Sequence, residues 1–122
     1  MATIVHQKIR VTDPSRGAAF MVLWETLTSA NAVGDAFEMP AWDVRSVQIV
    51  GTFDSSTIVL QGSNDGATWA TLTDPQGTAI SKTATGVEQI EEVTRYIRPS
   101  ASGGGASQDI DVYVLVTGYR SR

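Results

Sequence analysis

The chain alternates apolar and polar residues with a period of two in several short stretches. The clearest is 109–117, where one face carries Ile110, Val112, Val114 and Val116. Residues 44–53 alternate in the same way, with Val47 and Ile49 on one face. Such alternation is typical of β-strands with one face in a core. No stretch combines helical spacing of apolar residues with capping residues. A short helix is the alternative to a strand only at 18–27, which lacks an N-cap residue.

Turn-forming residues divide these stretches about every 8–12 residues. The strongest turn signal is Gly-Ser-Asn-Asp-Gly at 62–66. A tight turn at 54–56 predicts a hairpin between strands 44–53 and 57–61. Together the spacing predicts an all-β protein, a β-sandwich of about eight antiparallel strands with jelly-roll or Greek-key connections.

Two ends of the pattern are less regular. In 4–11, Ile9 and Val11 alternate with Lys8 and Arg10, which predicts an edge strand or an extended arm. We therefore expect an N-terminal arm over 1–12 and a single sandwich domain over 13–122. Near the other end, the sequence predicts a strand 95–98 that ends at Pro99, followed by a flexible loop over 100–107.

Two strands are apolar on both faces. In 18–27, Met21 and Leu23 lie on the face opposite Trp24, and in 109–117 the second face holds Tyr113 and Leu115. A strand of this kind is covered on both sides. One face belongs to the core, so we expect the other to contact something else.

Composition narrows the classes of function. The 122 residues carry a formal net charge of −4, which argues against general nucleic-acid binding because such binding requires a basic surface. There are no cysteines, so disulfides and thiolate metal sites are excluded. No apolar run is long enough to span a bilayer and no signal peptide is recognisable, so we expect synthesis in a cytoplasm and no membrane partner.

Catalytic residues are not evident, and we expect no enzyme activity. The single histidine, His6, is expected to be a plain polar residue of the arm. A glycosidase requires two carboxylates across a cleft. The acidic residues of 88–92 and the pair Asp109 and Asp111 are more typical of solvated faces, and Glu91 or Glu92 is expected to pair with Arg95 or Arg98.

Metal and cofactor binding are not predicted either. Calcium is the only metal for which ligands are present in loops, namely Asp54, Asn64, Asp65 and Asp74. Their spacing is not that of an EF-hand loop, and we expect these side chains to cap turns instead.

The three tryptophans allow two interpretations. Trp24, Trp42 and Trp69 are candidates for a platform on which a sugar ring stacks. Alternatively they pack in the fold or at subunit contacts, and we expect Trp69 in the core and Trp42 exposed in a loop.

Basic residues gather at the termini of this acidic chain. They are Lys8, Arg10 and Arg16 near the start and Arg120 and Arg122 at the end. They either bind an acidic neighbour or are simply solvated.

About two thirds of the chain, from 38 to 116, resembles a group of small virion proteins of tailed bacteriophages. The residues that carry the resemblance are EMP (38–40), RSVQIVGTF (45–53), VLQGSNDG (59–66), Trp69, TLTDPQG (71–77) and RYIRP (95–99). The segment 62–69 is also similar to a local motif of discoidin-type and carbohydrate-binding jelly rolls, where it is largely structural.

The first resemblance implies a structural component of the virion, most plausibly a capsid decoration or cement protein. Its expected partners are the major capsid protein and further copies of itself in a homotrimer, with no direct nucleic-acid contact. The candidate contact residues are Lys8, Arg10, Arg16, Met21, Leu23, Trp42, Val50, Val59, Tyr113, Leu115, Arg120 and Arg122. The alternative is a carbohydrate- or receptor-binding module of a phage fibre or tail, with Trp42, Trp69 and Asp65 lining a loop-end site.

Overall fold

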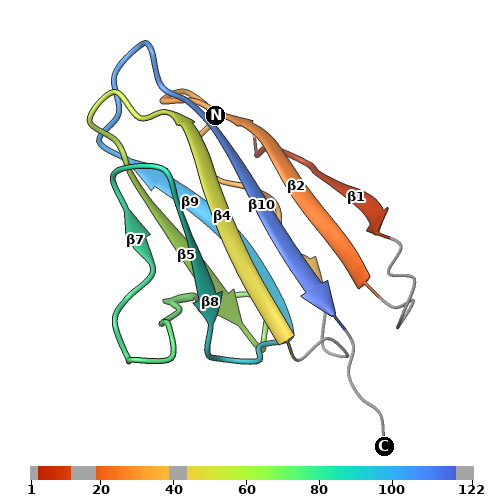
Figure 1. The fold of residues 1–122 in the computed structure, drawn as a ribbon. Helices are drawn as coiled ribbons and strands as arrows, with labels where there is room; N and C mark the ends of the chain where they lie inside the picture. Colours follow the sequence, from red (N-terminus) through yellow and green to blue (C-terminus); the bar gives the residue numbers. More distant parts are fainter. Residues whose placement is uncertain (1–2, 12–18, 39–43, 118–122) are drawn as a thin grey trace, which may run out of the picture.

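The protein is a β-sandwich in the computed structural model, which describes residues 3–11, 19–38 and 44–117. Within these ranges there are ten strands and no helix, and therefore no helix that could cross a membrane. The strands form two sheets that face each other across one core (Figure 1). The predicted fold class is confirmed.

The first sheet has the strand order β1-β2-β10-β4-β8. Its strands are β1 (His6–Val11), β2 (Ala19–Leu27), β10 (Asp109–Thr117), β4 (Val44–Thr52) and β8 (Gly86–Ile90). The second sheet has the order β3-β9-β5-β6, and β7 pairs with β5 beside it. Its strands are β3 (Phe37–Glu38), β9 (Tyr96–Ser102), β5 (Thr57–Ser63), β6 (Ala70–Thr71) and β7 (Ser81–Lys82).

The chain passes repeatedly from one sheet to the other. Strands β2, β4, β8 and β10 belong to the first sheet, whereas β3, β5 and β9 belong to the second. The pairings between the strands are antiparallel. An alternating course through two packed antiparallel sheets is the jelly-roll arrangement, one of the two predicted connections.

The core lies where the inner faces of the sheets meet. On β10 the buried residues are Ile110, Val112, Val114 and Val116, as the alternation predicts. They pack with residues of β2 and β4 and, from the second sheet, with Ile58, Leu60 and Ile97. At about 25 cal/mol per Å² of apolar surface removed from water, this burial is the main force that holds the two sheets together.

The prediction of a hairpin around the turn 54–56 is wrong. The turn is present, with Asp54 and Ser55 at positive φ, but β4 pairs with β10 and β8 whereas β5 pairs with β9, β6 and β7. The turn therefore connects the two sheets. Alternation indicates which residues of a strand face the core, and it does so correctly for Ile58 and Leu60, but it does not identify the neighbouring strand.

Pro99 does not end a strand, contrary to the prediction, and β9 continues through it to Ser102. The carbonyl of Pro99 accepts a hydrogen bond from the amide of Gly34, on the side away from β5. Since the N and C=O of one strand residue point to the same side, the absent N–H of proline costs no bond to β5.

The N-terminal segment is part of the first sheet, so of the two predicted alternatives the structure has the edge strand. β1 pairs with β2 from His6↔Trp24 to Val11↔Ala19. The carboxylate of Asp35 accepts hydrogen bonds from the backbone amide of His6 and from Trp24 Nε1, both at 3.0 Å. The His6 ring lies 2.9 Å from the same carboxylate and packs edge-on against Phe37. His6 is therefore a structural contact and not a plain polar residue of an arm.

Candidate binding surface on the first sheet

The outer face of the first sheet carries apolar side chains on its central strands. Tyr113 lies directly opposite Leu23, and Leu115 lies opposite Met21, across the β10–β2 pair. Val50 lies on the same face of β4, opposite Asp111. We refer to these five residues, Met21, Leu23, Val50, Tyr113 and Leu115, as the apolar strip. Alternation places them outward because their chain neighbours point into the core.

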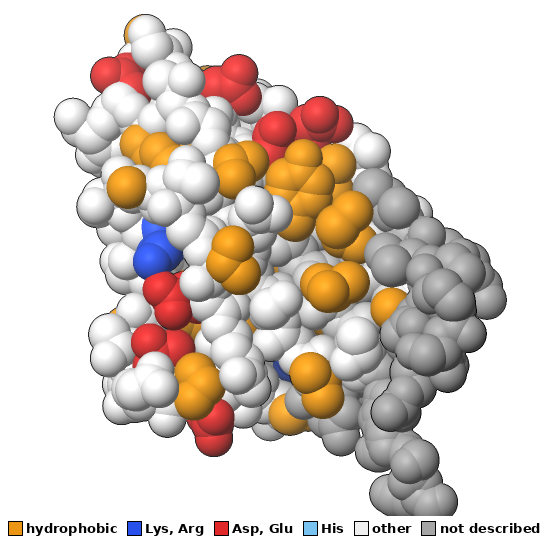
Figure 2. All heavy atoms as spheres, in the orientation of Figure 1, with side chains coloured by type: hydrophobic (Ala, Val, Ile, Leu, Met, Phe, Trp, Pro, Cys, Tyr) orange, Lys and Arg blue, Asp and Glu red, His pale blue; other side chains and the backbone are white. Residues whose placement is uncertain are grey.

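No element of the described chain covers this strip. Figure 2 shows apolar side chains gathered over β10 and β2 on the face turned to the viewer. Leu115 is 38% exposed, and Met21, Val50 and Tyr113 are half-buried. Leu23 is buried at 7% exposure. The outer face thus retains apolar surface that folding alone does not remove from water.

An acidic rim borders one end of the apolar strip. It consists of Glu25, Asp109 and Asp111, and acidic side chains are visible above the apolar ones in Figure 2. Asp111 lies where the register of β10 against β2 shifts, and it is half-buried. Burial raises the pKa of the Asp111 carboxyl, and the charges of Glu25 and Asp109 raise this pKa further. The rim therefore concentrates negative charge that a basic partner group would stabilise.

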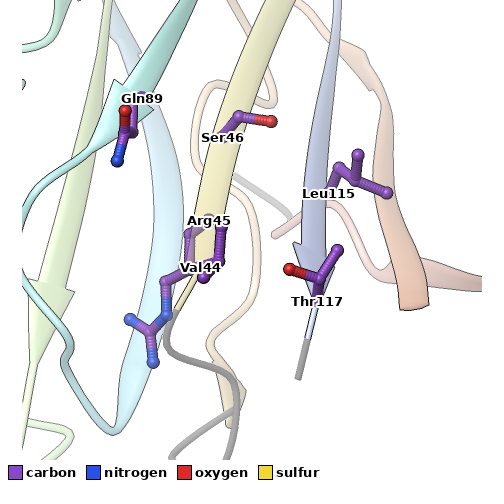
Figure 3. A pocket seen from close by; sticks show the side chains of 6 residues that line it. All are labelled: Val44, Arg45, Ser46, Gln89, Leu115 and Thr117. Atoms are coloured by element: carbon purple, nitrogen blue, oxygen red, sulfur yellow. The ribbon is translucent and has the colours of Figure 1, made fainter. Parts of the chain in front are cut away.

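A shallow hollow lies at the other end of the strip. It is lined by Val44, Arg45, Ser46, Gln89, Leu115 and Thr117. Figure 3 shows that these side chains come from three adjacent strands, β8, β4 and β10. Arg45 is buried, and its Nη2 donates a hydrogen bond to the carbonyl of Thr94 at 2.8 Å.

The structure brings together only part of the predicted contact set. Val59 lies on the outer face of the second sheet, opposite Ser100, and so is on the other side of the sandwich from the strip. Lys8 of β1 pairs with Val22 of β2, whose side chain points into the core, and its Nζ lies 5.1 Å from the centroid of the Phe20 ring. The side chain of Lys8 therefore faces away from the strip. The side chain of Arg10 and all of Arg16, Trp42, Arg120 and Arg122 lie outside the described residues.

The tryptophans do not form one platform. Trp24 is fully buried in the core. Trp69, expected in the core, is instead half-buried on the outer side of the second sheet, where the Arg98 guanidinium lies 4.2 Å from its ring centroid. The prediction failed because β6 places Trp69 on the same side as Thr71, whose partner Gln61 points outward.

The loop carboxylates cap turns, as expected. Asp65 Oδ1 accepts hydrogen bonds from the amides of Ala67 and Thr68 at 2.8 Å, and these bonds, together with one from the Ser63 hydroxyl, lower the pKa of Asp65. Asp74 Oδ1 accepts from the amides of Gln76 and Thr78. No group of three His, Cys, Asp or Glu side chains suited to a metal ion occurs in the described ranges.

The expected pairing of Glu91 or Glu92 with Arg95 or Arg98 is wrong. Arg95 Nε binds Glu38 at 2.8 Å, because β3 and β9 are neighbours. Glu92 accepts hydrogen bonds from the amide and hydroxyl of Thr73. Residues close together in sequence are separated here by the change from β8 to β9, which belong to different sheets.

Sequence reasoning missed one surface feature, the contact between Arg98 and Trp69. The signal that was available is the alternation in β9, where Ile97 is buried and Arg98 must point outward. Nothing in the local pattern links Arg98 to a tryptophan 29 residues earlier, since that contact depends on the pairing of β9, β5 and β6.

No family model matches this chain, and no curated protein matches it. Among solved structures, YomS from the SPBc2 prophage is similar, with a TM-score of 0.61 and 15% identity over 82% of this chain and 95% of that chain. An adhesin domain of Lys-gingipain from Porphyromonas gingivalis has a TM-score of 0.44 at 12% identity, over 96% of this chain and 85% of its own. A carbohydrate-binding module from Cellvibrio mixtus lichenase has a TM-score of 0.28 at 9% identity, over 95% of this chain and 88% of its own. The likeness to YomS shows a shared fold, and the other two are too low to support an argument.

Proposed function

We propose that the protein is a structural component of a tailed-phage virion that binds and stabilises the capsid shell as a decoration protein, without catalysis. The observation that carries the proposal is the uncovered apolar strip on the first sheet. The packing of a monomer does not require the apolar side chains of Met21, Tyr113 and Leu115 on an outer face. A cement protein, in contrast, must bury surface against its neighbours.

The charges beside the strip indicate the chemical character of a complementary partner surface. Lys or Arg side chains of the partner would pair with the acidic rim, and apolar side chains beside them would pack against the strip. Pairing the rim with basic groups would relieve the repulsion that Asp111 experiences from Glu25 and Asp109. The proposed partner is therefore a face of the major capsid protein with an apolar centre and a basic margin.

Two further points support a phage origin. YomS, which has the same fold, is a prophage-derived protein. The segments that resemble small virion proteins include 45–53 and 95–99, which contribute most of β4 and the start of β9. We also propose that the chain forms a homotrimer, as three-fold positions of a shell would favour.

The test uses shells assembled without this protein. The purified chain is added, shells are pelleted, and bound protein is measured over a range of concentrations. We expect saturable binding that Leu115→Asp weakens about a hundredfold, because a charge would be buried in the apolar contact. Val93→Asp is the matched control, since Val93 is 49% exposed outside the strip.

Three outcomes would contradict the proposal. They are no binding of the wild type, equal binding of Leu115→Asp, or equal loss with Val93→Asp. Light scattering measures the oligomeric state separately, and a monomer at all concentrations would contradict the trimer.

A second candidate is a glycan-binding module of a fibre or tail. One observation favours it: Trp69 lies at the surface beside Arg98 and is not in the core. Asp65, expected to line this site, uses its carboxylate to close its own turn. Glycan-array binding that is lost in Trp69→Ala would support this candidate, and a silent array would count against it.

A further inference from the structure

Arg98 is held in a fixed orientation on the outer face of the second sheet. Its guanidinium lies over the Trp69 ring, 4.2 Å from the centroid, and its Nε donates a hydrogen bond to Gln61 Oε1 at 2.9 Å. The ring contact and the Nε bond together restrict the orientation of the guanidinium. The terminal nitrogens are thus presented in one defined direction.

The positive charge of Arg98 has no acidic partner among the described residues. Arg95, three residues earlier, provides the contrast, because it lies over Tyr96 and also pairs with Glu38. Partial burial lowers the pKa of Arg98, yet a guanidinium remains charged at any ordinary pH. A partly desolvated cation without an anion is a group that a negatively charged ligand would stabilise.

Apart from the Trp69 ring and Val59, the neighbours of Arg98 on this face carry hydrogen-bonding groups. On β9 the outward neighbours are Tyr96 and Ser100, and across β5 the row continues from Gln61 to Thr71. This surface contrasts with the apolar strip of the first sheet. Hydroxyl and amide groups around an arginine match a sugar, whose own hydroxyls need partners, better than they match the apolar centre of a protein interface.

We propose that this surface is a binding site for a carboxylate-bearing sugar. The terminal nitrogens of Arg98 take the carboxylate in a two-bond fork, and Gln61, Thr71 and Tyr96 are positioned for the hydroxyl groups. The site lies on the face opposite the apolar strip and is independent of shell binding. For the glycan-binding function proposed above as the second candidate, Arg98 would be the centre of the site and acidic sugars would be the ligands.

The test is a titration of the full chain followed by NMR. The probes are N-acetylneuraminic acid and galacturonic acid oligomers, each compared with its neutral methyl ester. We expect the acids to shift the Trp69 indole and Arg98 Nε signals, and the esters to bind about tenfold more weakly or worse. Arg98→Lys keeps the charge but removes the fork, so it should lower affinity about tenfold, whereas Arg95→Lys should leave affinity unchanged.

Several results would overturn the proposal. One is the absence of any shift at Trp69 with both acids, and another is equal binding of acids and esters. Equal affinity of wild type and Arg98→Lys, with both shown to be folded by circular dichroism, would also contradict it. Binding of a glutamate-rich peptide without binding of either sugar would assign the surface to an acidic protein instead.

Discussion

The two sheets share one core but differ in their outer faces. The outer face of the second sheet is mainly polar, with Arg98, Gln61 and Ser100 along its central strands and Val59 among them. The outer face of the first sheet instead carries Tyr113 and Leu115 beside an acidic rim. A sandwich requires only the inner face of each sheet to be apolar. On the second sheet the outward apolar side chains, Val59 and Trp69, lie beside polar residues. On the first sheet five apolar residues form one strip, and this is the surface that we propose a partner covers.

The largest expected difference is between consecutive residues of β4. Ile49 is 1% exposed in the core, and Val50 belongs to the apolar strip. Ile49→Ala should lower the free energy of unfolding by about 2–5 kcal/mol, and Val50→Ala by less than about 1 kcal/mol. Urea denaturation measures both. A Val50→Ala loss as large as that of Ile49→Ala would mean that the strip serves the fold and not a partner.

The next expected effect concerns binding to the shell. Tyr113→Ala removes the aromatic side chain of the strip and should weaken shell binding about tenfold to a hundredfold. Tyr96→Ala, on the outer face of the second sheet, should leave shell binding unchanged. Pelleting with shells measures both variants. If Tyr96→Ala weakened binding more than Tyr113→Ala, the roles of the two faces would be reversed.

The two sheets should also differ in how ionisation of a carboxylate changes the stability of the folded state: Asp111 belongs to the first sheet, and Asp65 follows β5 of the second. The raised pKa of Asp111 means that its ionised form destabilises the folded state, a cost that is absent at low pH and appears as the pH rises through that pKa. Asp111→Asn should therefore raise the melting temperature at pH 7, and the gain should vanish below about pH 4.

The lowered pKa of Asp65 has the reverse consequence. Its ionised form stabilises the folded state at pH 7, and that stabilisation declines as the pH falls below about 4. Asp65→Asn should lower the melting temperature at pH 7, with a smaller effect in acid. Thermal unfolding from pH 3 to pH 7 measures both variants, and shifts of the same sign would contradict the account.

The smallest expected effect concerns the stack on the second sheet. Trp69→Ala removes the ring beneath Arg98 and should cost about 0.5–1 kcal/mol, because the contact lies near the surface. Urea denaturation measures this cost. A loss above about 3 kcal/mol would place Trp69 in the core after all.

The sequence predicted faces of strands better than neighbours of strands. The alternation of β10 correctly assigned Val114 to the core and Leu115 to the outer face, because a strand turns every second residue to the same side. It could not show that β4 and β5 lie in different sheets, since a turn can close a hairpin or cross the core. The same limit hid the contact between Arg98 and Trp69, which depends on three paired strands.

The candidate site was accessible from the sequence for a related reason. Met21, Leu23, Tyr113 and Leu115 were recognised because they are apolar on the second face of strands whose first face is already apolar. Val59 met the same local criterion but lies on the other sheet, so strand pairing decides which apolar residues form one surface.

The central claim is that the outer face of the first sheet contacts the shell. An electron cryomicroscopy reconstruction of the phage particle with this protein bound tests it most directly. The account predicts the apolar strip and the acidic rim against the capsid protein, with basic side chains opposite Glu25, Asp109 and Asp111. A reconstruction in which this face points to solvent, or in which the protein is absent from the particle, would contradict it.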